Sequence, residues 1–232
     1  MPAATFHKST LREYFESIVI AVILALFVRT WVVQAFKIPT GSMENNLLIG
    51  DHLLVNKFLF APTLGRVERT LLPIRDIRRG DVIVFKYPDE PDRDFIKRVI
   101  GLPGETIEMK AKKIYINGQP LDEPYVHFLE PVGDAQEVIS YDLRENYPKT
   151  VVPQDFYFVM GDNRDNSQDS RYWGFLPRNY IKGRALMIYW SYESGREDYL
   201  DDGFGASARR IVGVVTHFFT KTRWERIFHQ IH

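Results

Sequence analysis

The strongest constraint on the fold is a continuous apolar stretch near the N-terminus. From Ile18 to Val28 every side chain is apolar, and the apolar character continues past Arg29 as far as Phe36. Residues 17–36 provide about twenty positions, or roughly 30 Å of helix, if Arg29 extends to a headgroup and Trp31 lies at the interface. The segment 17–36 is therefore predicted to be a transmembrane anchor.

A cleaved secretory signal is the alternative interpretation. Lys8 and Arg12 resemble the charged region before a signal's apolar core, and residues 33–35 resemble a small-residue cleavage site. Arg29 and Lys37 balance these two charges on the far side, so the charge bias does not orient an anchor. The sequence favours the anchor and leaves its orientation open.

Charge and cysteine content exclude several function classes. The 30 Lys and Arg residues equal the 30 Asp and Glu residues, which argues against nucleic-acid binding through counterion release. The chain has no cysteine, which excludes thiol catalysis, disulfides, Cys-ligated zinc and iron–sulfur clusters. With 45% hydrophobic residues it is too polar for a polytopic membrane protein.

Beyond the anchor, short runs rich in Val, Ile, Phe and Tyr predict strands, because they lack helical periodicity and are bounded by Gly, Pro and Asp. The predicted strands are 37–39, 51–58, 81–87, 94–100, 113–116, 156–160 and 185–190. Asn117-Gly118 predicts a two-residue hairpin, since both residues tolerate positive φ. The fold class is therefore mainly β.

Composition also suggests an insertion. Residues 105–153 are more polar than their flanks, which indicates a β core of 37–104 and 154–232 with a smaller inserted domain of 105–153. Residues 201–208 are predicted to be a loop. The tail from Arg209 mixes apolar residues with cations; packing on the core is favoured, and contact with a membrane surface is the alternative.

The segment Ile38-Pro39-Thr40-Gly41-Ser42-Met43 predicts a turn. A serine at such a turn is expected to be exposed, with its own N–H beside its hydroxyl, and acyl transfer needs such a nucleophile and oxyanion donor. The alternative is an ordinary turn in which Thr40 or Ser42 bonds its own backbone. The sequence contains no G-x-S-x-G, H-E-x-x-H or phosphate-loop pattern.

Lys97 lies in an otherwise apolar predicted strand, on the same face as Phe95 and Val99 by period-2 alternation. If buried there, its pKa should fall from about 10.4 toward 7 to 8, where a neutral amine can act as a base. An outward-facing strand lysine is the alternative.

Residues 161–175 form a long polar loop ending in Tyr172-Trp173-Gly174-Phe175. A calcium-loop interpretation fails, because the required Gly and distal Glu are missing and Arg164 lies inside the loop. Its charges are expected to pair with each other in a rigid, partly buried loop with every donor satisfied. The alternative is a loop that only braces the fold.

Together these segments resemble the bacterial type I signal peptidases, membrane-anchored Ser/Lys endopeptidases that release exported proteins from their signal peptides. The resemblance covers the anchor and most of the chain beyond it. Its motifs are Thr40-Gly41-Ser42-Met43, the strand 79–85, Lys97-Arg98-Val99 and the highly specific Gly161-Asp162-Asn163-Arg164-Asp165-Asn166-Ser167. The family fold, an antiparallel β catalytic core with an inserted smaller domain, agrees with the composition change.

The resemblance implies a role for each motif residue. Ser42 would be the nucleophile and Lys97 the general base. Ser167 would orient the Lys97 amine, and the Ser42 N–H with the Thr40 hydroxyl would form the oxyanion hole. The supporting ion pairs would be Asp162 with Arg98 and Asp169 with Arg171, and the substrate pockets would be lined by Phe36, Ile38, Met43, Val84, Phe95 and Ile96. No metal or organic cofactor is implied.

The resemblance also implies a location. The chain would cross the bacterial cytoplasmic (inner) membrane once, with residues 1–16 in the cytoplasm and the catalytic domain on the outer, periplasmic or extracytoplasmic, face. Its partners would be the signal peptides of exported preproteins and the lipid bilayer, with no nucleic acid. An association with the protein-export machinery is compatible with this role.

Two departures from the family pattern stand out. Asn45-Asn46 replaces the usual Pro-Thr, so the turn is expected to be less rigid, and the chain has one anchor rather than two. Two other functions stay open: a specialised processing peptidase of the same chemistry, in conjugation or pilus assembly, and a non-catalytic membrane-tethered β domain that binds peptides by strand addition. The joint presence of Ser42, Lys97 and Ser167 argues against the second.

Overall fold

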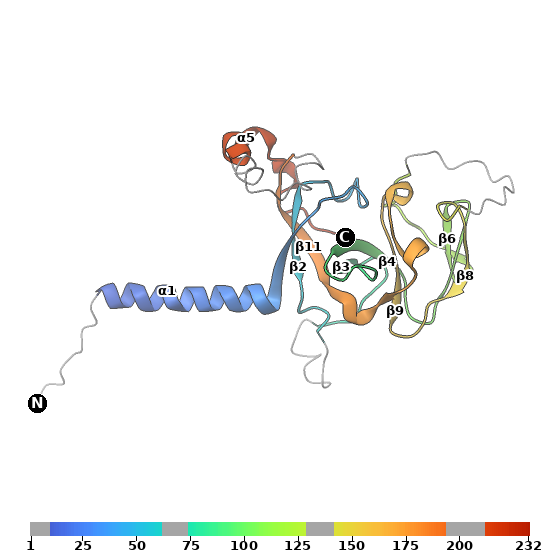
Figure 1. The fold of residues 1–232 in the computed structure, drawn as a ribbon, viewed down its shortest axis with the longest axis horizontal. Helices are drawn as coiled ribbons and strands as arrows, with labels where there is room; N and C mark the ends of the chain where they lie inside the picture. Colours follow the sequence, from blue (N-terminus) through green and yellow to red (C-terminus); the bar gives the residue numbers. More distant parts are fainter. Residues whose placement is uncertain (1–9, 62–73, 129–141, 194–211) are drawn as a thin grey trace, which may run out of the picture.

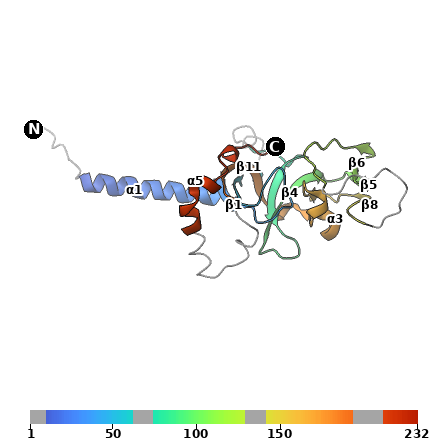
Figure 2. The same cartoon turned by 90° about the horizontal axis from the view of Figure 1, so that it is seen from above.

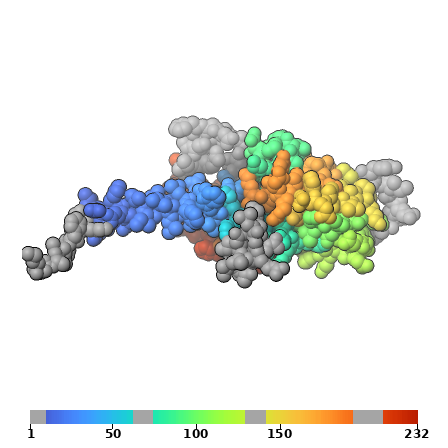
Figure 3. All heavy atoms as spheres, turned by 90° about the horizontal axis from the view of Figure 1, so that it is seen from below, coloured from blue at the N-terminus to red at the C-terminus, as the bar shows by residue number. Residues whose placement is uncertain are grey.

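The structure, a computed structural model, describes residues 10–61, 74–128, 142–193 and 212–232. It begins with helix α1 (Thr10–Phe27), which continues into a π-helical segment, η1 (Val28–Val32). The helix Thr10–Val32 is long and apolar enough to cross a membrane, and none of its residues is buried. It projects from the β body (Figure 1), and its atoms stand clear of the rest of the molecule (Figure 3).

The helix boundaries differ from the predicted anchor. The helix begins at Thr10, and it ends before strand β1 (Val33–Lys37), so the prediction of an anchor up to Phe36 is wrong. Residues 33–37 pair along their whole length with β2 (Asp51–Asn56). The apolar character of these residues suggested that the helix continues, but their hydrogen bonds to β2 make them a strand. Phe36 is therefore part of the β body. Lys8, the loop 201–208 and Arg209 lie outside the described residues.

The β body is a 7-stranded antiparallel sheet with the order β1-β2-β11-β3-β4-β9-β10. Besides β1 and β2 it contains β3 (Val82–Lys86), β4 (Asp94–Gly101), β9 (Phe156–Met160), β10 (Leu176–Pro177) and β11 (Ile181–Ser191). The predicted mainly β, antiparallel fold class is confirmed. The predicted strand 37–39 is wrong beyond its first residue. Strand β1 ends at Lys37, and Pro39 has no N–H to donate to a ladder.

This sheet curls so that its distant strands share one core. Three strands separate β1 from β4 in the sheet order, yet Ile38, just after β1, belongs to the same buried cluster as Val84 of β3 and Ile96 of β4. Residues 36–42 therefore lie opposite β4. The curl creates the space in which the candidate site is found.

A second, 4-stranded sheet has the order β7-β6-β5-β8. It contains β5 (Thr106–Lys110), β6 (Lys113–Ile116), β7 (Gln119–Pro120) and β8 (Tyr147–Val151). The turn between β6 and β7 has φ values of 53° at Asn117 and 81° at Gly118, as the sequence predicts. Ile107 and Met109 of this sheet share a buried cluster with Ile100 and Phe158 of the first, so the two sheets pack on each other.

Short helices complete the described fold: η2 (Arg164–Asn166), α3 (Ser170–Trp173), η3 (Arg178–Tyr180), α5 (Phe218–Lys221) and η5 (Trp224–Arg226). The last two belong to the C-terminal tail. Seen from above, α5 overlaps the end of α1, but Figure 1 shows that it lies well to one side of that helix (Figures 1 and 2). The prediction that the tail packs on the core is wrong for Val215, Trp224 and Phe228, which are exposed. Ile231, which was not among the residues expected to do so, packs into the main core.

Candidate active site

The centre of the site is a contact between two side chains from different motifs. Ser42 lies in the turn after β1, and Lys97 lies on β4 opposite it. The Lys97 amine donates a hydrogen bond of 2.6 Å to the Ser42 hydroxyl oxygen, across 55 positions of sequence. Ser42 is only 7% exposed, so the expectation of an exposed turn serine is wrong; the curled sheet encloses the turn.

The Lys97 side chain is only 3% exposed, so it points into the molecule. The alternative of an outward-facing strand lysine is therefore wrong. Burial lowers its pKa to about 8; Asp169 and Asp162 act in the opposite direction, and Arg171 adds to the lowering. A charged amine loses its hydration in this site, which favours the neutral form. Near pH 8 a large fraction of Lys97 is therefore neutral and able to accept a proton.

Ser167 lies close to the nucleophile's backbone but not in the predicted contact. It is buried, and its hydroxyl has no hydrogen-bond partner within the described part of the chain. The predicted bond to the Lys97 amine is therefore not formed in this structure. The glycine at position 161 allows Ser167 to lie close to the Ser42 backbone. A Cβ at this position would collide with both the Ser167 side chain and the Ser42 carbonyl oxygen. Sequence analysis missed this packing role, although Gly161 begins the polar loop.

The structure brings together both of the ion pairs named from the sequence. Arg98 bonds Asp162 through two nitrogens, at 2.8 and 2.7 Å, and Arg171 bonds Asp169 through two, at 2.8 and 2.9 Å. Asp169 also accepts the Gly161 N–H at 3.1 Å. All four charged side chains are buried. Removing one partner of either pair would therefore leave an uncompensated buried charge. These pairs hold both ends of the loop that carries Ser167.

Other charges of this loop pair outside it, contrary to the prediction. The Arg164 guanidinium bonds Glu123, and Asp165 lies 3.3 Å from the Lys112 amine. Both partners come from residues near the second sheet, which clamps the loop from that side. The prediction that every donor of the loop is satisfied is also wrong, because Arg171 Nη1 and Trp173 Nε1 lack partners in the described part of the chain.

The two asparagines after the serine have defined conformations and contacts. Asn45 adopts φ 78°, a left-handed conformation that asparagine tolerates. The Asn46 amide donates to Asp162 at 2.6 Å and to the Tyr125 carbonyl at 3.1 Å. These contacts connect the turn to the polar loop and to Tyr125, and a less rigid turn stays a prediction.

An open cleft of about 540 Å³ runs past Ser42 and Lys97. Its lining includes five of the six expected pocket residues, Phe36, Ile38, Val84, Phe95 and Ile96. Thr40, the expected oxyanion donor, also lines it, together with Arg93, Asn166 and Gln168, which sequence analysis missed. Asn166 and Gln168 flank Ser167 in sequence, and this position next to an expected site residue could have identified them as cleft residues. Met43 is not among the residues that line the cleft, so the expectation that it lines a pocket is wrong; its side chain is fully buried in the core cluster.

This arrangement can carry out acyl transfer. A neutral amine within hydrogen-bond distance can take the proton of the serine hydroxyl, and the resulting oxygen can attack a carbonyl carbon in the cleft. Among the residues that the structure describes, no group of three or more His, Cys, Asp or Glu could hold a metal ion. The contact between the Lys97 amine and the Ser42 hydroxyl supports a serine nucleophile with a lysine base.

Comparisons with known proteins agree with this chemistry. A family model described as signal peptidase, peptidase S26, matches residues 11–190. Signal peptidase I of Pseudomonas aeruginosa is 38% identical, covering 78% of this chain and 72% of the relative, and that of Aquifex aeolicus is 36% identical, covering 78% and 85%. A crystal structure of a signal peptidase I from Enterococcus faecalis is 36% identical with a TM-score of 0.37, covering 48% of this chain and 97% of that one. The chain belongs to the signal peptidase family, peptidase S26.

Proposed function

We propose that this protein is a membrane-associated serine endopeptidase that removes signal peptides from exported proteins. The observation that carries the proposal is the 2.6 Å contact between the Lys97 amine and the Ser42 hydroxyl beside an open cleft. The signal peptidase relatives supply the substrate class. A peptide-binding domain without catalysis would not need a buried lysine with a lowered pKa on a serine.

The reaction follows from these two groups. The neutral Lys97 amine takes the Ser42 proton as the serine oxygen attacks the carbonyl carbon of the last residue of the signal peptide. The tetrahedral oxyanion accepts hydrogen bonds from the Ser42 N–H and the Thr40 hydroxyl. Lys97 then gives its proton to the departing amine, and the signal peptide stays on Ser42 as an ester. A water molecule, deprotonated by Lys97, cleaves the ester and restores the serine.

Thr40→Val tests the second oxyanion donor. Valine keeps the β-branched shape and removes only the hydroxyl, so kcat should fall on the order of a hundredfold, equivalent to about 3 kcal/mol. KM should change little, because the hydrogen bond strengthens only as the tetrahedral intermediate forms. Steady-state kinetics on a peptide substrate measure both; an unchanged kcat would show that Thr40 only shapes the turn.

The cleft also predicts the sequence that is cut. A peptide extended between residues 36–38 and β4 would point alternate side chains into the cleft. The walls there include the apolar side chains of Phe36, Ile38, Val84, Phe95 and Ile96, and we expect the pockets between them to be shallow. Alanine should fit before the cut, and alanine or valine two positions earlier, whereas a charged side chain would lose its hydration without a partner.

Cleavage of an ordinary exported preprotein in detergent, followed by sequencing of the new N-terminus, tests the proposed activity. The cut is expected after an Ala-x-Ala pattern just beyond the apolar segment. In the matched preprotein the alanine before the cut is replaced by phenylalanine, and the rate should fall on the order of a hundredfold, since overpacking costs about 1–3 kcal/mol. Equal rates for the two substrates would contradict the pocket, and no cut at all would contradict the function.

The proposed topology places α1 across the cytoplasmic membrane and the β body on the outer face, in contact with the lipid surface. Support comes from the exposed apolar helix and from the substrate, whose cleavage site follows an apolar segment that enters the membrane. A protease added to right-side-out vesicles should digest the β body, and it should leave the β body intact in inverted vesicles. The opposite pattern would reverse the orientation.

A further inference from the structure

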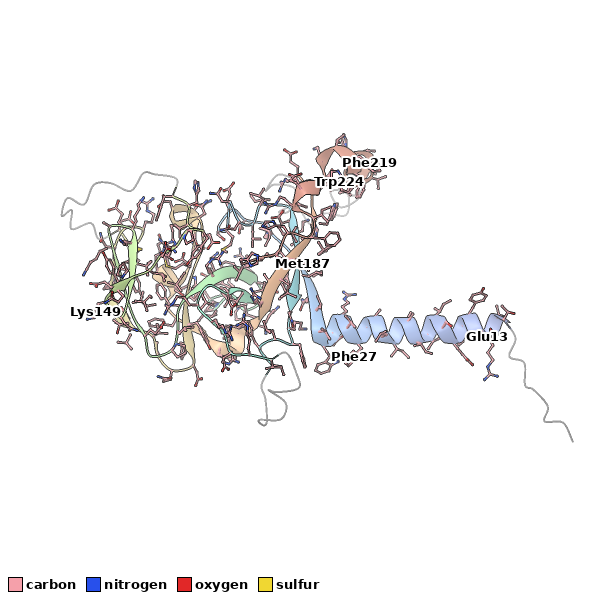
Figure 4. All side chains as sticks on the ribbon, turned by 180° about the vertical axis from the view of Figure 1, so that it is seen from behind. Glu13, Phe27, Lys149, Met187, Phe219 and Trp224 are labelled. Atoms are coloured by element: carbon pink, nitrogen blue, oxygen red, sulfur yellow. The ribbon has the colours of Figure 1, made fainter. Side chains whose placement is uncertain are left out.

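One short segment outside the cleft contacts the turn that carries Ser42, the strand that carries Lys97 and the loop that carries Ser167. Residues 123–127, which we call the bridging segment, follow β7 and precede β8 of the second sheet. That sheet lies at the end of the molecule opposite α1, where Lys149 of β8 is labelled in Figure 4. None of residues 123–127 lines the cleft. The bridging segment therefore acts on the site from outside the space that a substrate would occupy.

Backbone hydrogen bonds join the bridging segment to the polar loop. The His127 N–H donates to the Asp162 carbonyl at 2.9 Å, and the Arg164 N–H donates to the His127 carbonyl at 3.0 Å. These two bonds form a short parallel bridge. At the other end of the segment, the Glu123 carboxylate accepts hydrogen bonds from the Arg164 guanidinium. The loop that carries Ser167 is thus held by the bridging segment through both backbone and side chain.

Tyr125 lies at the centre of the bridging segment and covers the Arg98 guanidinium. Asp162 and the carbonyl oxygens of Gly80 and His232 occupy the hydrogen-bonding edge of this group. The Tyr125 ring lies over its face, with 4.0 Å between the ring centroid and Arg98 Cζ, within the range of a cation–π contact. The ring is half-buried and packs against the core between the two sheets. Arg98 is therefore held on its face as well as on its edge.

Tyr125 also connects the two sides of the catalytic pair. Arg98 directly follows Lys97 on β4, so any shift of its guanidinium is transmitted to the strand segment that carries the amine. On the nucleophile side, the Asn46 amide donates to the Tyr125 carbonyl at 3.1 Å, four positions after Ser42. One residue thus contacts both elements whose side chains meet at 2.6 Å in the site.

We propose that Tyr125 is a positioning residue for the Ser42–Lys97 pair, and that the second sheet acts on catalysis through it. Proton transfer requires the serine oxygen and the amine to stay within hydrogen-bond distance, and a displacement of about 1 Å can cost a hundredfold in rate. Tyr125 limits such a displacement, because it contacts one element on each side of the pair. The inference rests on the proposed peptidase function.

Two substitutions at position 125 separate the ring from the hydroxyl. Tyr125→Leu keeps an apolar side chain but removes the π face over Arg98, whereas Tyr125→Phe keeps the face and removes only the hydroxyl that bonds Glu123 at 3.1 Å. Tyr115→Leu is the matched control. Tyr115 is half-buried on β6, and the Lys110 amine lies 5.8 Å from its ring centroid, so this change also removes a ring beside a cation, within the second sheet. Cleavage of a preprotein in detergent is measured against substrate concentration and pH.

Tyr125→Leu should lower kcat by about tenfold to a hundredfold, with KM within about twofold of the unsubstituted enzyme, because the cleft walls are untouched. Tyr125→Phe should restore kcat, and Tyr115→Leu should leave it unchanged. The folded fraction of each variant is checked by urea unfolding, so that a loss of folded protein is not counted as a loss of kcat.

The pH profile gives a readout that a loss of folded protein would not move. Burial lowers the Lys97 pKa to about 8, and the charge of Asp162 opposes this lowering. Water that replaces the Tyr125 ring would screen Asp162, whereas Asp169 and Arg171, which also act on this pKa, keep their pairing with each other. The midpoint of the profile should therefore move below about 8 in Tyr125→Leu and stay in place in Tyr125→Phe and in the control.

A Tyr125→Leu variant that cleaves like Tyr115→Leu overturns the inference, while activity of the unsubstituted enzyme upholds the proposed function. An equal loss in Tyr125→Phe assigns the effect to the hydroxyl, and a raised KM assigns it to substrate binding; either result also overturns the inference. A fall in kcat that matches the folded fraction, with an unmoved pH midpoint, shows a structural role only. An unsubstituted enzyme that cuts no preprotein removes the proposed function and the inference together.

Asn46→Ala provides a second test if Tyr125→Leu does not fold. It releases the Tyr125 carbonyl from the turn that carries Ser42 and leaves the ring over Arg98 in place. The same fall in kcat at unchanged KM is expected. A normal kcat in Asn46→Ala would show that the turn does not depend on the bridging segment, and it would overturn the inference.

Discussion

Ser42→Ala should lower kcat for peptide cleavage by about 10⁶-fold, the loss typical of removing the nucleophile from a serine protease. Without the serine oxygen no ester can form, and the remaining donors only bind the substrate. The fold should persist, because the change removes a single hydrogen bond, from Lys97, at a position in a turn. Activity assays and thermal unfolding of the same preparation measure the two effects.

Ser191→Ala is the matched control for this change. Ser191 is also buried, and its hydroxyl bonds the Asp51 carboxylate at 2.7 Å on β11, away from the cleft. Its loss should cost about 2 kcal/mol of unfolding free energy, because the bond is made to a charged group, while activity is retained. Near-normal turnover by Ser42→Ala would refute the proposed nucleophile.

Lys97→Arg and Lys97→Met should both lower kcat by about 10⁴-fold, the upper range for loss of a general base. A guanidinium stays protonated and cannot take the serine proton, so keeping the charge does not rescue activity. In the unsubstituted enzyme the rate should rise with pH through about 8, because the amine must be neutral to act. A pH-independent rate between pH 6 and about 9 would contradict Lys97 as the base.

The same lysine should make the folded protein less stable at neutral pH. Its pKa is 10.5 when unperturbed and about 8 in the folded site, so the unfolded state binds the proton more tightly. The penalty is complete below about pH 8 and fades as the pH rises toward the unfolded value. At pH 7 Lys97→Met should therefore increase the unfolding free energy by on the order of 3 kcal/mol, and less at pH 10. Urea unfolding in detergent at the two pH values separates this gain from the loss of activity.

Local features of the chain were readable from sequence. The apolar run after Ser17 predicts a membrane-spanning helix, and the hairpin at Asn117-Gly118 follows from the φ values that these two residues tolerate. Ser42 and Lys97 were identifiable because each stands in a short motif of specific composition. In each case the information lies in contiguous residues, whose preferences do not depend on what packs against them.

Tertiary structure decided which side chains meet. Residues 33–36 read as part of an apolar helix, but pairing with β2 makes them a strand. Arg164 finds Glu123 rather than a neighbour in its own loop, and Met43 turns into the core while its neighbour Ser42 faces the cleft. The curl of the sheet and the packing of the second sheet set these contacts. A linear pattern records the type of each residue, but the partner depends on how distant strands are brought together, and that is a property of the whole chain.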